Sequence, residues 1–190
     1  TVEFNNIADN TASNNAGGVY VTGIDITSLA NNSIEGNTGY YGGGGRIFGN
    51  TVTLTNNSIV GNRSDSSSGG IYAGGDIVTF TGNRIEDNAN KFSSGGGVIV
   101  VGDTLTFANN SIVSNAAARS GGGIYASGDT LTFTSNSIER NKSSDVGGGV
   151  YALGDTIIFM NNTMTGNIAD GAVGGVYIGE LVGDGGATLY

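Results

Sequence analysis

The stretch GDTLTFTSNSIERN, residues 128–141, recurs with few changes as GDTIIFMNNTMTGN at residues 154–167. Both copies contain the pattern Asn-x-Ile/Met-x-x-Asn, and the chain of 190 residues repeats this pattern seven times. The seven copies are Asn5/Ile7/Asn10, Asn32/Ile34/Asn37, Asn57/Ile59/Asn62, Asn83/Ile85/Asn88, Asn110/Ile112/Asn115, Asn136/Ile138/Asn141 and Asn162/Met164/Asn167. The first Asn residues of successive copies lie 27, 25, 26, 27, 26 and 26 positions apart. A nearly constant period of this length predicts a solenoid, because a single unit cannot bury its apolar face without neighbours.

An apolar residue stands three positions before the first Asn of every copy. These residues are Val2, Leu29, Leu54, Phe80, Phe107, Phe133 and Phe159. Around Phe133 the sequence alternates between apolar residues and Thr, with Thr132 between Leu131 and Phe133. Alternation with a period of two predicts a strand that buries Leu and Phe and exposes Thr. We therefore expect the seven apolar residues to form one column of the core.

The remainder of each coil is a variable polar loop, a Gly run and a second strand. The loops have four to six residues, such as RSDSSS at 63–68 and KSSDV at 142–146, and GGGIYA at 121–126 is typical of the strand. A Gly-Asp turn closes the coil at Asp76, Asp103, Asp129 and Asp155, which leaves no room for a helix. We predict an all-β fold, a right-handed single-stranded parallel β-helix of about seven coils, each with about 26 residues and two or three short strands. The coils would rise by about 4.8 Å each, or about 34 Å in total, and residues 1–190 would form one domain.

The two Asn columns are interpreted as structural ladders that satisfy buried backbone at the turns. Identical side chains stack on one another when parallel strands are in register, and a column of Asn can pass amide hydrogen bonds from coil to coil. Buried polar groups mostly satisfy hydrogen-bonding needs of the fold, so we do not expect these residues to bind a ligand.

The composition excludes several kinds of chemistry. The chain has no Cys, Pro, His or Trp and contains 36 Gly, so it has no thiol nucleophile, no Ser-His pair, no Cys/His zinc site and no disulfide. The net charge of −9 and the pI near 4.1 argue against nucleic acid or an anionic membrane surface as partner. No apolar run is long enough to insert into a membrane, and the first residues, TVEFNNIADN, lack the features of a signal peptide.

The repeats resemble those of chlamydial polymorphic outer membrane proteins, which combine Phe-x-x-Asn with Gly-Gly-x-(Ile/Val), and more loosely those of autotransporter passengers. Here the first motif reads FTGN, FANN, FTSN and FMNN at Phe80, Phe107, Phe133 and Phe159, and the second ends at Ile71, Val98, Ile124, Val150 and Val176. The chain departs from the pattern in its first coils, where Val2 and Leu29 replace Phe. The resemblance implies a right-handed β-helix, an extracellular or bacterial cell-surface location, and adhesion or display, and it implies no catalytic residue.

Two polar arrays are candidate surface sites. The Asp residues of the Gly-Asp turns would stand about 5 Å apart, a spacing that calcium could bridge, but Asp is also a favoured turn residue and we prefer that interpretation. The outward Thr residues of the long strands could form a flat array similar to the ice-binding faces of some antifreeze proteins. The full pairs are Thr51/Thr53, Thr104/Thr106 and Thr130/Thr132, and the array is interrupted by Ile26/Ser28, Ile77 and Ile158. Since exposed strands favour Thr for its β-propensity alone, ice binding is the alternative function and not the first.

A third candidate is a column of tyrosines next to the Ile/Val column. Its members are Tyr20, Tyr72, Tyr125, Tyr151 and Tyr177, with Ile47 and Ile99 between them. Alternation predicts that they face outward, where they could stack on sugars or form a ladder that covers the coil itself. Arg46 is assigned to the Ile/Val column, so either the local register shifts to turn it outward or a carboxylate pairs with it.

We predict no enzymatic activity and no cofactor. A β-helix that degrades polysaccharide would gather acids and bases in one groove, whereas Asp65, Glu86, Asp87 and Asp145 lie in short loops or turns with no sign of convergence. Degradation or binding of polysaccharide is therefore the least favoured function. The sequence begins in mid-coil and ends without a visible cap, so we expect a segment of a longer chain or fibre. Its end faces would be covered by further coils or by end-to-end self-association, and a glycan or host surface is a further candidate partner.

Overall fold

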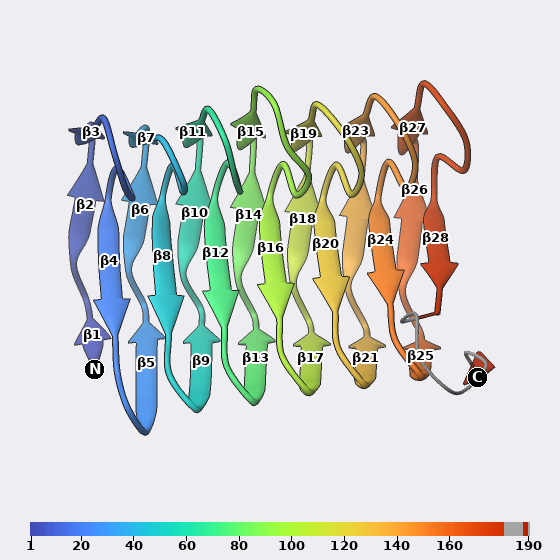
Figure 1. Cartoon of the computed structure of the whole chain (residues 1–190), viewed down its shortest axis with the longest axis horizontal. Helices are drawn as coiled ribbons and strands as arrows, with labels where there is room; N and C mark the ends of the chain where they lie inside the picture. The colour runs from blue at the N-terminus through green and yellow to red at the C-terminus, as the bar shows by residue number, and fades with distance from the viewer. Residues whose placement is uncertain (181–187, 190) are drawn as a thin grey trace.

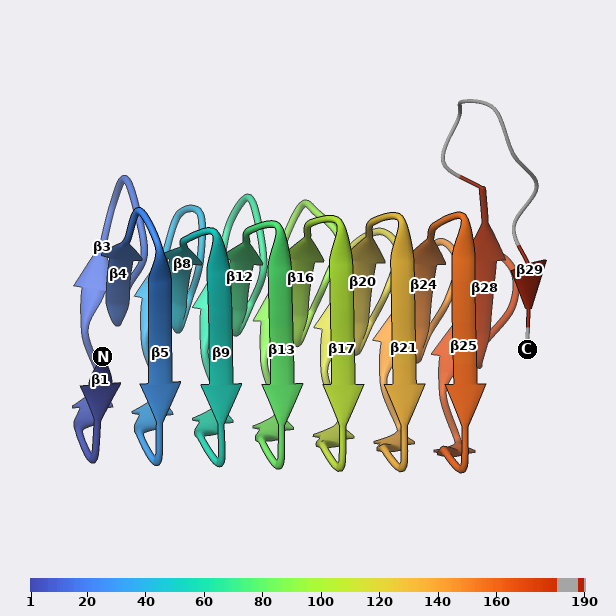
Figure 2. The same cartoon turned by 90° about the horizontal axis from the view of Figure 1, so that it is seen from below.

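A computed structural model describes residues 1–180 and 188–189. The chain forms a parallel β-helix with four strands in each coil. Corresponding strands of successive coils lie side by side and form four parallel sheets, A to D (Figures 1 and 2). Within the described residues every strand pairing is parallel and no helix is present. The predicted all-β solenoid is confirmed, but the prediction of two or three strands per coil was wrong.

Sheets A and B contain the repeated Thr/Phe segment and the segment between the two Asn residues. Sheet A consists of β1 (Val2–Glu3), β5 (Ile26–Ala30), β9 (Thr51–Thr55), β13 (Ile77–Thr81), β17 (Thr104–Ala108), β21 (Thr130–Thr134), β25 (Thr156–Met160) and β29 (Thr188–Leu189). Sheet B consists of β2 (Asn6–Ala8), β6 (Ser33–Glu35), β10 (Ser58–Val60), β14 (Arg84–Glu86), β18 (Ser111–Val113), β22 (Ser137–Glu139) and β26 (Thr163–Thr165).

Sheets C and D flank the variable loop of each coil. Sheet C consists of β3 (Thr11–Ala12), β7 (Thr38–Gly39), β11 (Arg63–Ser64), β15 (Ala89–Asn90), β19 (Ala116–Ala117), β23 (Lys142–Ser143) and β27 (Ile168–Ala169). Sheet D consists of β4 (Val19–Thr22), β8 (Gly45–Phe48), β12 (Ile71–Gly74), β16 (Val98–Val101), β20 (Ile124–Ser127), β24 (Val150–Leu153) and β28 (Val176–Gly179). Most of the expectation about the chain's tail falls on residues 181–187 and 190, which lie outside the described residues.

The core consists of columns of like side chains. Phe80, Phe107, Phe133 and Phe159 stack with ring centroids 5.3, 4.9 and 4.4 Å apart, and the first three are buried. Ile residues of sheet B and inward residues of sheet D complete the same cluster. Register is kept through all coils because a slip of one residue would turn each of these side chains toward water.

Each corner beside an Asn is made by one residue in the left-handed conformation. The residue before every Asn of both columns has a positive φ, from 51° at Arg140 to 66° at Gly61 and Gly82. Gly, Asn, Asp and Ser fill most of these positions, as expected for residues that tolerate this conformation. One such residue between two short strands makes a tight corner, which is how four strands fit into a coil of about 26 residues.

Candidate functional site

The Asn columns are hydrogen-bonded ladders inside the corners, and in the inner coils they are buried. Asn88 has no exposed surface, and its Oδ1 accepts bonds from the backbone N–H and the Nδ2 of Asn62 at 3.0 and 2.9 Å. Its own Nδ2 donates to Asn115 Oδ1 at 3.0 Å and to the carbonyl oxygen of Ile59 at 2.8 Å. The same pattern repeats along the inner part of both columns, so these residues satisfy the backbone of the corners and point to no ligand.

The four terminal members of the ladders depart from the expected burial. Asn5 and Asn10 are exposed, and Asn162 and Asn167 are only half-buried. Asn167 Oδ1 accepts bonds from the backbone N–H and the Nδ2 of Asn141, both at 3.0 Å, and its Nδ2 donates to the carbonyl oxygen of Ile138 at 2.7 Å. Among the described residues no further Asn accepts a bond from Asn167. An Asn of the ladder is therefore buried only where a coil lies on either side of it.

The ladders have a direction. In every coil before the last, each Asn donates to the Oδ1 of the Asn in the next coil toward the C-terminus, from Asn5 to Asn32 at one end and from Asn136 to Asn162 at the other. The N-terminal face of the β-helix therefore presents amide oxygens, and the C-terminal face presents amide donors.

The outward Thr array lies on sheet A with three columns in register. The first column is Ile26, Thr51, Ile77, Thr104, Thr130 and Thr156, and the second is Ser28, Thr53, Thr79, Thr106, Thr132 and Ile158. The third, which the sequence analysis missed, is Ala30, Thr55, Thr81, Ala108, Thr134 and Met160. The alternation in the sequence, which continues to Thr134 after Phe133, was the signal that could have revealed it. The six predicted Thr residues thus lie on one flat face, at intervals set by the parallel sheet.

The tyrosine column runs along the outside of sheet D. Tyr125 pairs with Tyr151, and Tyr151 with Tyr177, and their rings stack with centroids 5.1 and 4.8 Å apart. Burial raises the pKa of Tyr125 above its usual value, and the neighbouring Tyr72 adds to this. The pKa of Tyr151 is raised first by burial and then by Tyr125 and Tyr177. The ring of Tyr151 is therefore covered on both faces, and the rings of Tyr125 and Tyr177 are each covered on one face, which leaves little of this ladder open to a sugar.

The assignment of Arg46 to the Ile/Val column was wrong, and of the two alternatives the register shift that turns Arg46 outward is confirmed. Gly45 pairs with Ile71 in that column, and Arg46 pairs with Tyr20 and Tyr72 in the tyrosine column. The extra Gly, Gly45, occupies the inward position. Only Gly fits there, because a Cβ would lie 2.6 Å from a methyl carbon of Val19. Ile47, assigned to the tyrosine column, is fully buried and pairs with Ala73, which was the second error.

Arg46 lies among four aromatic rings. Its guanidinium carbon is 5.1 Å from the ring centroid of Phe48, 5.4 Å from Tyr41, 5.6 Å from Tyr72 and 5.9 Å from Tyr20. Nη1 donates to Asn15 Oδ1 at 3.2 Å, and the buried Nε has no hydrogen-bond partner among the described residues. No ion pair of the described part of the chain involves Arg46. We call Arg46, Asn15 and these four rings the Arg46 cluster.

The acidic residues do not converge in the part of the chain that the structure describes. Asp65 and Asp145 follow β11 and β23, which are three strands apart in sheet C, or about 14 Å. Glu86 forms an ion pair with Arg84. The Asp residues of the Gly-Asp turns, Asp76, Asp103, Asp129 and Asp155, are all exposed. Among residues 1–180 and 188–189, no three acidic groups could hold a metal ion together.

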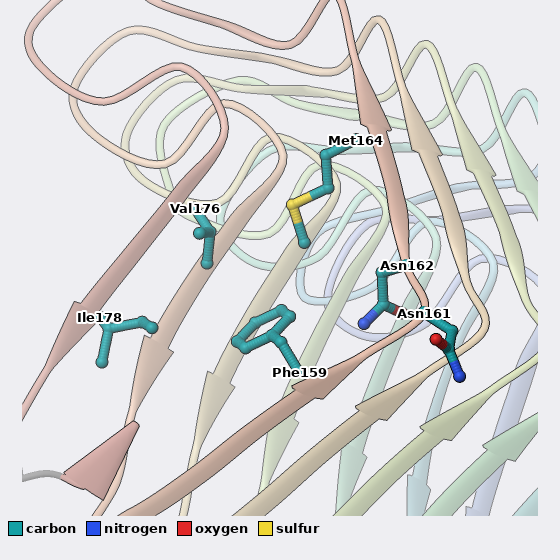
Figure 3. Close-up of a pocket in the computed structure, with 6 residues that line it drawn as sticks. All are labelled: Phe159, Asn161, Asn162, Met164, Val176 and Ile178. Carbon is teal, nitrogen blue, oxygen red and sulfur yellow. The ribbon is translucent and has the colours of Figure 1, made fainter. Parts of the chain in front are cut away.

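The C-terminal face of the β-helix contains an open hollow of about 490 Å³. Phe159, Met164, Val176 and Ile178 point into it, and Asn162 lies at its rim (Figure 3). These residues are the last members of the core columns and of the first Asn ladder. The floor of the hollow is therefore apolar, with an amide of the Asn ladder at its edge.

No helix of the described residues is long and apolar enough to cross a membrane.

No match was found among the curated proteins or among the solved structures. The family described as "Right handed beta helix region" matches residues 1–138 and 42–182, which together include nearly the whole chain. The match agrees with the stacked coils and gives them the right-handed sense that parallel crossovers predict. The chain belongs to the right-handed β-helix family.

Proposed function

We propose that this protein is a non-catalytic structural or adhesive β-helix module of a cell surface or an extracellular assembly. The observation that carries the proposal is the equivalence of the coils. The carboxylates of the Gly-Asp turns recur about 5 Å apart along a whole exposed column, so no pair of them marks a single specialised site, and Asp65 and Asp145 lie on strands about 14 Å apart. The resemblance to polymorphic outer membrane protein repeats and to autotransporter passengers supports the surface location.

A substrate panel tests this proposal. We expect the 190-residue chain to release no product from neutral or acidic polysaccharides, measured as reducing ends and as unsaturated uronate. Turnover that disappears on changing one carboxylate, for example in Asp65→Asn, would defeat the proposal.

The end faces support a second part of the proposal, assembly along the axis. The hollow at Phe159 and Met164 and the amide donors of Asn162 and Asn167 fit a further coil, supplied by a longer polypeptide or by a second copy of the chain. Sedimentation velocity and electron microscopy test self-stacking, for which we expect rods that lengthen with concentration. A monomer at every concentration would exclude the second copy as the source of that coil.

Ice binding is the alternative function, favoured by the three outward columns in register on sheet A. The Thr positions form a lattice of about 4.8 Å between strands and about 6.6 Å along them. Thermal hysteresis measured on the native chain and on Thr106→Tyr tests this function. We expect hysteresis in neither, and hysteresis that Thr106→Tyr abolishes would establish ice binding in its place.

A further inference from the structure

We propose that the Arg46 cluster is a binding site for a carboxylated sugar at the end of a glycan. The site lies on the outer face of sheet D, across β4, β8 and β12, which are neighbours in the first coils (Figure 1). This inference rests on the proposed adhesive role and specifies its ligand.

Charge distinguishes this place from the rest of the outer face of sheet D. The outward positions of the seven strands are Tyr20, Thr22, Arg46, Phe48, Tyr72, Gly74, Ile99, Val101, Tyr125, Ser127, Tyr151, Leu153, Tyr177 and Gly179. Arg46 is the only one of these residues with an ionised side chain at neutral pH. A single cation on a face without carboxylates, in a protein of net charge −9, is complementary to one acidic group.

The guanidinium also has hydrogen-bonding capacity that the protein does not use. Its one side-chain partner among the described residues is Asn15, bonded through Nη1, and Nη2 makes no hydrogen bond to those residues, so the outer edge of the guanidinium is available to a ligand; Nε also lacks an acceptor but is buried. The surrounding rings displace water and lower the local dielectric constant, which strengthens the attraction to a carboxylate. Guanidinium groups bind carboxylates in a planar, often bidentate geometry.

The rings of the cluster remain open, unlike those of Tyr125, Tyr151 and Tyr177. Tyr20 and Phe48 meet at 75°, and Phe48 and Tyr72 meet at 45°, so these rings are splayed around Arg46 and do not cover one another. Tyr20 and Tyr41 are 52% and 43% exposed. Exposed aromatic faces suit the apolar face of a pyranose, and tyrosine hydroxyls and Asn15 suit its hydroxyl groups.

The same observations disfavour a polyanion as the ligand. One cation can neutralise one carboxylate, and each further charge of a polyuronate would face a protein with net charge −9. A mostly neutral glycan that ends in one acidic pyranose can pair its carboxylate with Arg46 and place its apolar face against the aromatic rings.

Calorimetric titration with sialyllactose, lactose and a galacturonate oligomer tests the site. We expect sialyllactose to bind, lactose to bind at least about tenfold more weakly, and the oligomer to bind no better than lactose. Arg46→Gln should remove the preference for sialyllactose, and Tyr41→Ala, which changes an exposed ring, should weaken sialyllactose binding several-fold. Arg140→Gln, at an exposed arginine in the corner between β22 and β23, is the matched control and should leave sialyllactose binding unchanged. Thermal unfolding of each variant establishes that it is folded.

Each other result overturns the inference. These results are no binding of sialyllactose at millimolar concentration, equal binding of lactose, preference for the galacturonate oligomer, or full binding by folded Arg46→Gln and Tyr41→Ala. If Arg46→Gln does not fold, Tyr41→Ala and the comparison of the three saccharides decide alone. Failure here leaves the structural module intact, because the proposed function is refuted by polysaccharide turnover and not by missing affinity.

Discussion

Replacing one Asn in the middle of a ladder should destabilise the β-helix far more than replacing one at its end. In Asn88→Ala the Oδ1 that accepts the backbone N–H of Asn62 is lost, and so are the side-chain bonds to Asn62, Asn115 and the carbonyl oxygen of Ile59. A buried main-chain donor without a partner costs about 1–3 kcal/mol, and each of the other three bonds contributes about 0.5–1.5 kcal/mol. We therefore expect the free energy of unfolding to fall by roughly 3–7 kcal/mol.

The matched control is Asn10→Ala. Asn10 is exposed, and its side chain makes one hydrogen bond, from Nδ2 to Asn37 Oδ1 at 2.9 Å. We expect this variant to lose at most about 1 kcal/mol. Urea denaturation followed by far-ultraviolet circular dichroism measures both changes. A loss below about 1 kcal/mol in Asn88→Ala, or equal losses in the two variants, would refute the claim that the ladders stabilise the corners.

Three further predictions concern the core, the corners and the tyrosine column. Phe107→Ala should cost about 3–5 kcal/mol in urea denaturation, because its ring is stacked on both sides, whereas Phe4→Ala, at a ring that is 77% exposed, should cost much less. Gly61→Ala should cost about 1–2 kcal/mol in the same assay, because Gly61 has a φ of +66°, which is unfavourable for Ala. No clash adds to this cost, since the atom nearest to the new Cβ, the backbone nitrogen of Gly36, would be 3.9 Å away. The pKa values of Tyr125 and Tyr151 are raised from 10.0, so their neutral forms stabilise the folded chain below pH 10, and this stabilisation is lost as the pH rises through the folded pKa. Absorbance titration of phenolate and pH-dependent melting should show both effects, and the double variant Tyr125→Phe/Tyr151→Phe should show neither.

The fold could be predicted from the sequence because every coil contains the same two Asn residues and the same inward apolar residue. Phe133 and Leu131 alternate with Thr over five residues, which is long enough to identify a strand and its buried face. The two strands on either side of Asn141 have three and two residues, too few for alternation to be visible. Arg140 and Asn141 separate them, and Arg140, the left-handed residue, is of a type that does not indicate this conformation, so the number of strands per coil was underestimated.

The site was less predictable for a related reason. GGGG at residues 42–45 followed by Arg46 can be aligned with the neighbouring Gly runs in two registers, and only packing distinguishes them. Gly45 occupies the inward position beneath Val19, which turns Arg46 outward and Ile47 inward. The cluster also includes Tyr41 and Asn15, which belong to variable loops and have no counterpart in the repeat.

The direction of the Asn ladders has an electrical consequence. Each carboxamide has a dipole, and all those in a ladder point the same way, with oxygen toward the N-terminal coil and N–H toward the C-terminal coil. Chains of hydrogen bonds polarise one another, so a bond in the middle of the row is stronger than an isolated one. The two rows act like a pair of head-to-tail dipole columns, with partial negative charge at the N-terminal face and partial positive charge at the C-terminal face. The end charges therefore have the opposite sense to those of an α-helix, whose N-terminus is the positive end. A charged group placed at the N-terminal face therefore meets a potential of the opposite sign to that at the C-terminal face.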